Sequence, residues 1–193
     1  MRRQWRRTRR STAESTPGRP RVDPSPSIYK KTERIQRMRF TDFVNHQSVS
    51  AQLESLDKED AIRELITALV KVGDVPANQH EEVVGRIMER EKMGTTGIGN
   101  GVAVPHAKHP AVSRTIGTIG LSSQGVAFDA LDGGAVHILF LLISPPDQSE
   151  HHLQILEKIS RHLREDLFCR FLQQARTDTE IRQVLEDVDN ADL

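Results

Sequence analysis

The sequence predicts an α/β protein: a single domain with a small mixed β-sheet of four or five strands flanked by helices, preceded by a basic tail. Three observations support this. Apolar residues recur at helical spacing in some segments and as short unbroken runs in others. Hydrophobic residues make up 36% of the chain and aromatic residues only 4%, which indicates a core of Leu, Ile and Val. A length of 193 residues suits one domain.

Residues 1–37 form the basic tail, with twelve Lys and Arg against three Asp and Glu, although the whole chain has a formal net charge of zero. The segment lacks an apolar period and cannot bury enough surface to offset its ordering, so we predict disorder there and a folded domain over 38–189. The arginines could neutralise nucleic-acid phosphates. A solvated extension, or upstream sequence before Met38, is the preferred interpretation, because Trp5 alone does not supply interleaved aromatic side chains.

The composition predicts a cytoplasmic protein without a membrane segment. No apolar run approaches the roughly 20 residues that span a bilayer, and no apolar region follows the first arginines as in a secretory signal. The single Cys169 excludes an internal disulfide framework and agrees with a reducing compartment. Its position in a helical pattern suggests a buried, inert thiol.

Two helices should open the domain. Asp57 is predicted to cap the first, which has apolar residues near i, i+3, i+4 and i+7 and ends at Gly73. The second should run over residues 78–92. Its inward positions are predicted to be Val83, Val84, Ile87 and Met88. Arg90, near its C-terminal end, is either a solvated charge that favours the helix dipole or a group that folds over an anion site.

Strands should follow. Val102–Val104 is predicted to be a short buried strand that Pro105 ends by removing a backbone donor, which places His106 at the end of that strand, before a loop. Further along, the predicted strands are Thr115–Leu121, Val126–Phe128 and a long central one, Val136–Ile143.

The last third should be helical. Asp147 is predicted to start a helix, with Glu150 as its capping-box partner. On this helix His152 shares an apolar stripe, whereas His151, Lys158 and His162 lie on a more polar one. A short helix over 167–172 and a final helix opened by the Thr177 and Glu180 pair complete the domain; these two residues are predicted to form a capping box.

The stretch Gly94–His106 carries the strongest functional signal. Glycines at 97, 99 and 101 allow backbone N–H groups to turn toward one point, as in an anion-binding loop. Histidine has a neutral nucleophilic form and a charged form that are both accessible near neutral pH. The stretch therefore suggests a phosphate cradle next to a histidine nucleophile.

The run Gly97–His106 (GIGNGVAVPH), together with Met88–Thr96 before it, resembles the active-site signature of the type-2 IIA domains of the phosphoenolpyruvate sugar phosphotransferase system (PTS). These are fructose/mannitol-type domains, and the likeness is greatest to their nitrogen-regulatory branch. The similarity extends from about Phe40 to about Asp187. It includes the Phe128–Gly133 turn and the His152-Leu153 pair.

The resemblance implies a type-2 IIA fold with its active site at a sheet edge under the helix that carries His152. It implies that Nε2 of His106 accepts a phosphoryl group from the phosphocarrier HPr, that His152 orients this group, and that Arg90 neutralises it. One nitrogen of His106 must then be held protonated, typically by a backbone carbonyl. The expected phosphate-binding loop consists of Thr95, Thr96, Gly99, Asn100 and Gly101, with Asn100 at positive φ. No cofactor and no metal are expected.

Two departures from the family pattern stand out. Ala107 replaces a glycine or another small residue, and His137 opens a strand where the family often has a polar residue, which bears on the donor interface. His46, His80 and His109 are assigned no functional role.

Rival functions are weaker. A metal-dependent hydrolase could draw ligands from His106, His109, Glu150, His151 and His152, but the chain lacks an HExxH motif and Pro105 and Pro110 bound the first pair. A dinucleotide-binding site requires a helix directly after the glycines, but this sequence predicts a strand there.

Within the resemblance, the protein is either a sugar-specific IIA component that passes phosphate to a IIB domain or a regulatory module that controls target proteins. The absence of IIB and membrane IIC regions from this sequence favours the regulatory interpretation.

Overall fold

Strand β5 (Val136–Ser144) is the centre of the sheet, and every residue in it except His137 is buried. Such a continuous apolar run is typical of a strand covered on both faces. On one side β5 pairs antiparallel with β4 (Ile116–Val126). On the other side it pairs parallel with two short strands in succession, β2 (Val102–Ala103) and then β3 (His106–Lys108). Strand β1 (Gly97–Gly99) extends the sheet beyond β2.

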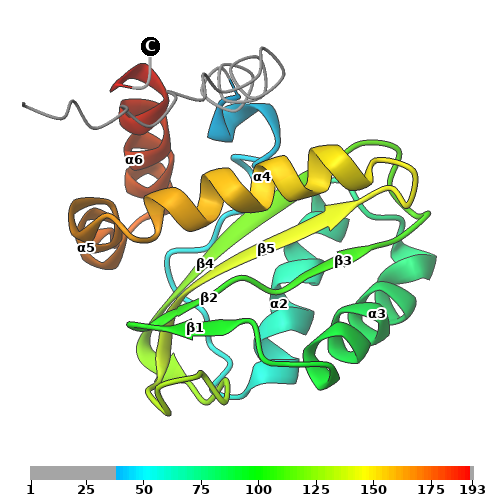
Figure 1. Cartoon of the computed structure of the whole chain (residues 1–193), viewed down its shortest axis with the longest axis horizontal. Helices are drawn as coiled ribbons and strands as arrows, with labels where there is room; N and C mark the ends of the chain where they lie inside the picture. The colour runs from blue at the N-terminus through cyan, green and yellow to red at the C-terminus, as the bar shows by residue number, and fades with distance from the viewer. Residues whose placement is uncertain (1–37, 192–193) are drawn as a thin grey trace, which may run out of the picture.

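The computed structural model describes residues 38–191, so the disorder predicted for residues 1–37 lies outside the described part. Helices cover both faces of the five-stranded mixed sheet (Figure 1), as the sequence predicted. The helical elements are η1 (Phe40–Asp42), α2 (Lys58–Lys71), η2 (Ala77–Gln79), α3 (His80–Lys92), α4 (Ser149–His162), α5 (Asp166–Gln174) and α6 (Asp178–Ala191).

Two hydrophobic clusters fill the space between the layers. Helices α2 and α3 pack on one face of the sheet, where Ile62, Leu65 and Ile87 meet Leu139 and Leu141 of β5. Helices α4, α5 and α6, with η1, cover the other face. Their buried contacts to the sheet include Phe40, Ile155, Ile159, Leu185, Ile138, Phe140 and Leu142. Alternate side chains of β5 therefore supply both cores.

The structure corrects two strand predictions. The segment after His106 is a strand and not a loop, because the long β5 continues beyond β2 and pairs its backbone with His106–Lys108. Pro105 interrupts the edge without ending it, since its carbonyl still accepts from Leu142 N at 3.0 Å. The strand predicted over 115–121 and the first residue of the one predicted over 126–128 belong to one strand, β4, with a register irregularity between Leu121 and Val126. Ala127 makes only an isolated bridge to Asp57, and Phe128 is in no strand.

Two of the predicted helix caps are confirmed and one is wrong. Asp57 caps α2 as predicted, accepting from the N–H of Asp60, and Thr177 and Glu180 form the predicted capping box at α6. The capping box predicted at Asp147 is wrong. Helix α4 begins at Ser149 after Gln148 without a side-chain cap, and Glu150 Oε1 accepts from Gln154 instead.

The polar stripe predicted on α4 is also wrong in part. His151 is exposed, but Lys158 is only 2% exposed and His162 only 4% exposed. Segment 38–43 and α5 pack over this side of the helix, which local sequence spacing does not show. The Lys158 ammonium lies 4.9 Å from the Phe40 ring centre, and the His162 ring lies 5.1 Å from the same ring.

Asp189 joins the two ends of the domain. Its carboxylate, 4% exposed, accepts hydrogen bonds from the N–H groups of Phe40 at 2.7 Å and Thr41 at 3.0 Å. These donors open η1 and have no partner within that helical turn. A carboxylate on α6 therefore holds the start of the domain against its last helix.

We expect Asp189→Asn to lower the free energy of unfolding by about 2 kcal/mol, because one charge-assisted acceptor is lost in a buried position. Urea unfolding followed by circular dichroism measures this change. Asp187→Asn is the matched control, since Asp187 is exposed on the same helix and its carboxylate accepts from the exposed side chain of Gln183. Equal stability of the two variants would contradict the role of Asp189.

Candidate active site

His106 is held in one tautomer by the backbone. It is the first residue of β3, and its Nδ1 lies 2.8 Å from the carbonyl oxygen of Val104. A carbonyl oxygen can only accept, so Nδ1 carries the proton and donates it to this bond. The neutral ring therefore presents the lone pair of Nε2, the nitrogen that the resemblance names as the nucleophile.

His152 lies beside His106, on the first turns of α4. Its side chain is buried, at 4% exposed, and the two imidazole ring centres are 5.5 Å apart. Its Nδ1 lies 2.7 Å from the hydroxyl of Ser144, the last residue of β5. The predicted inward orientation of His152 is confirmed, and the predicted pair of histidines shares one site at the edge of the sheet.

Both imidazoles are kept neutral. Burial lowers the pKa of His106 below its ordinary value of 6.5; the Val104 hydrogen bond opposes this, and the nearby charge of Arg90 lowers the pKa further. Burial, followed by the proximity of His106 and Lys108, lowers the pKa of His152 to about 4. At neutral pH His106 is therefore available as a nucleophile, and His152 has one ring proton.

The two histidines line a cavity of about 470 Å³ that also contains three cationic side chains. Arg90 donates from Nη1 to the carbonyl of Gly94 at 3.0 Å, and Lys108 Nζ lies 2.7 Å from the Ser149 hydroxyl. The third is Arg86, paired with Glu89 at 2.9 Å. A pocket with these groups suits a phosphoryl group.

Arg90 is predicted from the sequence, but Arg86 and Lys108 are not. Lys108 follows His106 by two positions on β3, so the two side chains lie on the same side of the strand. Arg86 precedes Arg90 by four positions, one helical turn away on α3. Both spacings were visible in the sequence, but they point to the site only once the strand and helix are assigned.

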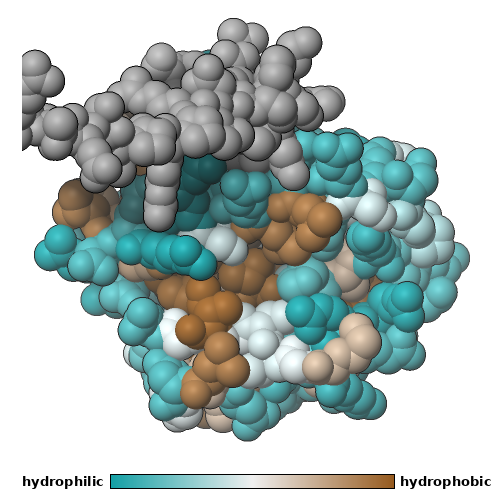
Figure 2. Space-filling view, viewed as in Figure 1, coloured by the Kyte–Doolittle hydropathy of each residue, from teal (hydrophilic) through white to brown (hydrophobic). Residues whose placement is uncertain are grey.

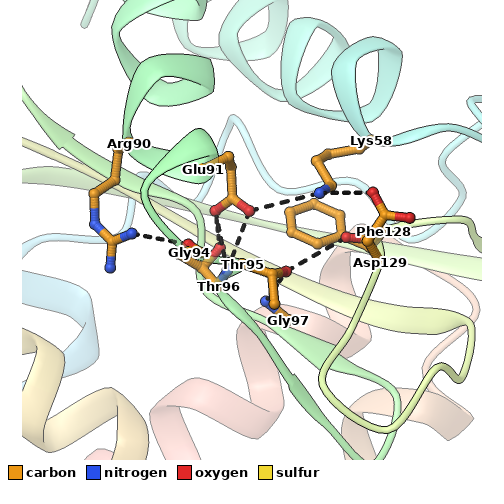
Figure 3. A network of polar contacts seen from close by, with 9 residues as sticks. All are labelled: Lys58, Arg90, Glu91, Gly94, Thr95, Thr96, Gly97, Phe128 and Asp129. Atoms are coloured by element: carbon orange, nitrogen blue, oxygen red, sulfur yellow. Dashed lines mark hydrogen bonds and ion pairs between the residues drawn. The ribbon is translucent and has the colours of Figure 1, made fainter.

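The structure does not bring the predicted phosphate-binding loop to the lining of this cavity. The buried carboxylate of Glu91 takes the N–H of Thr96 at 3.1 Å and its hydroxyl as well (Figure 3). The Thr95 hydroxyl accepts from Gly97 N at 3.1 Å. Lys58 joins the same network, with Nζ 3.0 Å from Asp129. These threonines hold the turn between α3 and β1 in place.

The glycine turn that follows is braced in a similar way. Asn100 has the predicted positive φ, 53°, between two glycines that also have positive φ. Its N–H donates to Asp132 at 2.9 Å, and Asp132 also accepts from Gly134 N at 3.0 Å. The Gly134 and Asn100 N–H groups lower the pKa of Asp132. Gly99 and Asn100 line a different cavity, next to α5, and Gly101 lies beside His137.

The remaining histidines and the cysteine have other surroundings. His109 is buried, with Nε2 3.3 Å from Glu82 and Nδ1 accepting from Ala111 N at 3.1 Å. No group of three or more His, Cys, Asp or Glu side chains within residues 38–191 is arranged to hold a metal. Cys169 is half-buried and donates to the Leu163 carbonyl at 3.3 Å, and burial raises the pKa of its thiol.

Apolar side chains surround the opening of the cavity. Leu153 is 64% exposed and Met93 is 79% exposed, and both line the cavity beside Leu156. Figure 2 shows hydrophobic residues gathered along α4 and continuing toward β1 on the face that it views. Ile98 of β1 is also exposed. Across residues 38–191, no helix combines the length and apolar character needed to cross a membrane.

Sequence comparison matches the chain to a known family. Residues 42–188 match the family described as the phosphoenolpyruvate-dependent sugar phosphotransferase system, EIIA 2. The nitrogen regulatory protein of Escherichia coli (strain K12) is 31% identical over 153 residues, which cover 79% of this chain and 92% of that protein. The fructose-specific EIIABC component of Bacillus subtilis (strain 168) is 30% identical over 152 residues, 79% of this chain but 24% of that protein.

A solved structure shares the fold. The nitrogen regulatory protein IIA-Ntr from Neisseria meningitidis superimposes with a TM-score of 0.67 at 27% identity. The match covers 75% of this chain and 97% of the other.

We expect an NMR titration of the imidazole resonances to place the inflection of His152 near pH 4 and that of His106 below 6.5. N-acetylhistidine amide in the same buffer is the reference. Coincidence of His106 with this reference would contradict the burial argument.

The low pKa of His152 also predicts acid sensitivity. The unfolded chain takes up a proton below pH 6.5 and the folded one only near 4, so the stability that neutral His152 contributes is lost as pH falls through this window. The full effect is about 3 kcal/mol. His152→Gln should therefore lose less unfolding free energy than wild type between about pH 7 and pH 4, as urea unfolding at each pH would show.

Proposed function

The chain belongs to the EIIA type-2 family of the phosphoenolpyruvate-dependent phosphotransferase system, whose members transfer phosphoryl groups, and we propose that it carries the phosphoryl group on Nε2 of His106. The donor is an HPr-type phosphocarrier in the cytoplasm. The observation that carries the assignment is the 2.8 Å contact between His106 Nδ1 and the Val104 carbonyl, which leaves Nε2 as the lone-pair nitrogen.

The transfer needs no general base. The Nε2 lone pair of His106 forms the new N–P bond while the N–P bond of the donor phosphohistidine breaks. The electron pair of that bond remains on the donor ring, which leaves as a neutral imidazole because its other nitrogen carries a proton. The Nδ1 proton of His106 stays in its bond to Val104 throughout. Catalysis then consists of positioning and of stabilising charge on the phosphoryl oxygens.

Cationic groups supply that stabilisation. Arg90 uses one guanidinium nitrogen for the Gly94 carbonyl, and a guanidinium has five N–H donors, so the same side chain can also reach a phosphoryl oxygen. Lys108 lies on the same side of β3 as His106. Together with His152, these residues form the proposed phosphoryl site in place of the Thr95–Gly101 loop.

The apolar rim fits a transient protein partner. Leu153 and Met93 present hydrophobic surface around a small polar centre. Contact with a donor protein would cover this surface and exclude water from the phosphoryl group in transit, which strengthens the charge interactions.

For the role in the cell we propose regulation: the phosphorylation state of His106 would control binding to target proteins. The support is the nitrogen regulatory protein of E. coli, which this chain matches over 92% of its length. The alternative is a sugar-specific component that passes phosphate to a IIB domain, and the match to a fructose-specific EIIABC component of nearly the same identity favours it.

We expect wild-type protein to acquire an acid-labile phosphoryl label from phosphoenolpyruvate, enzyme I and HPr, and His106→Ala to acquire none. His152→Ala and Arg90→Ala should label at least tenfold more slowly, because each removes charge or hydrogen-bond stabilisation of the phosphoryl group. His151→Ala, which alters the exposed neighbour of His152, is the matched control and should label normally. A folded wild-type protein that takes no label would contradict the proposal.

The regulatory role predicts slow onward transfer. Phosphorylated protein mixed with fructose- or mannitol-type IIB domains from the same genome should keep its label over minutes, as autoradiography of the separated proteins would show. Transfer within seconds would favour the sugar-specific alternative.

A further inference from the structure

The hydroxyl of Ser144 has an unusual position. It lies at the end of β5, fully buried, with Nδ1 of His152 at 2.7 Å on one side and the hydroxyl of Thr115 at 3.0 Å on the other. Thr115 is also buried, at 4% exposed. Among the described residues, these two hydroxyls have no other side-chain or backbone partner, so three groups share two hydrogen bonds.

Counting protons decides the direction of these bonds. If Thr115 donates to Ser144 and Ser144 donates to Nδ1 of His152, both hydroxyl protons have an acceptor. If Nδ1 of His152 is instead the donor, either the Thr115 or the Ser144 proton lacks an acceptor in a buried place. Leaving a buried donor without an acceptor is unfavourable, so the first arrangement is favoured.

The favoured arrangement places the proton of His152 on the opposite nitrogen. A neutral imidazole has one N–H, and when Nδ1 accepts, that N–H is at Nε2. The low pKa of His152, about 4, keeps the ring neutral at physiological pH. His106 is fixed in the opposite way, with its proton on Nδ1. The two rings, 5.5 Å apart, therefore differ: one has a free lone pair and the other a free N–H.

We propose that Ser144 is a positioning residue: its hydroxyl donates to Nδ1 of His152 and so directs the Nε2–H of His152 toward the phosphoryl group on His106. This inference rests on the proposed function of His106 and explains how His152 assists it. With the other tautomer, a lone pair would face the phosphoryl oxygens and repel them. The register of the sheet supports the placement, because Ser144 pairs with Lys108, two residues beyond His106.

Nitrogen-15 NMR of the unphosphorylated wild-type protein tests the tautomer directly. We expect Nδ1 of His152 to give a pyridine-type signal displaced by its hydrogen bond, and Nε2 to give a pyrrole-type signal. His106 should show the reverse assignment. A pyrrole-type Nδ1 on His152 would overturn the inference. Because no phosphoryl group is involved, this result is independent of whether His106 accepts one.

Kinetics with two variants test the consequence. Ser144→Ala should move the Nδ1 signal of His152 toward that of a free pyridine-type nitrogen and slow labelling of His106 by HPr about tenfold, because the ring loses its orienting partner. Thr115→Val is the matched control: it removes the neighbouring buried hydroxyl but leaves the Ser144 proton with Nδ1 as its acceptor. It should keep the tautomer and label within about twofold of wild type.

The outcomes separate the proposals. Normal labelling of Ser144→Ala, or equal slowing in both variants without a change at Nδ1, would overturn the role of Ser144 and leave His106 as the phosphoryl acceptor. Absence of label on wild-type protein would overturn the phosphocarrier function, while the NMR assignment of His152 would still stand or fall independently.

Discussion

The parallel pairing of β2 and β3 with one central strand is the constraint on which the site depends. Both short strands run parallel to β5 along the same edge, and Pro105 lies in the gap between them. In that gap Pro105 lacks a donor, yet its carbonyl and the N–H of Val104 still pair, with Leu142 and Thr96 respectively. The Val104 carbonyl is left to accept from His106. The interruption of the sheet edge at Pro105 thus fixes the tautomer of His106.

The same strand orients the second histidine. Strand β5 ends at Ser144, and the chain then turns back over the sheet as α4. This turn places His152 in contact with the Ser144 hydroxyl. Strand β5 therefore positions both rings: it pairs with the strand that begins at His106, and its last residue contacts His152. Because β5 is buried on both faces, these contacts are held by the packing of both hydrophobic clusters.

The parts of this arrangement that follow from local sequence could be predicted, and the parts that depend on distant segments could not. His106 follows from a contiguous motif, and the inward position of His152 follows from the spacing on its helix. The glycine loop shows what local sequence omits, because Glu91 and Asp132 accept from the N–H groups of Thr96 and Asn100, which appear free in the sequence. Burial of Lys158 depends on η1, more than a hundred residues earlier in the chain. Local spacing contains no information about such contacts.

Charge explains how one site could serve both transfer and regulation. A phosphoryl group on a side chain brings a charge of about −2 near neutral pH. In the free protein Arg90, Lys108 and Arg86, the last paired with Glu89, line the cavity next to two neutral imidazoles, inside an apolar rim. Phosphorylation would place an anion among these cations without changing the rim. Electrostatic complementarity governs partner choice more than it governs affinity, so a partner that buries the rim would still distinguish the two states.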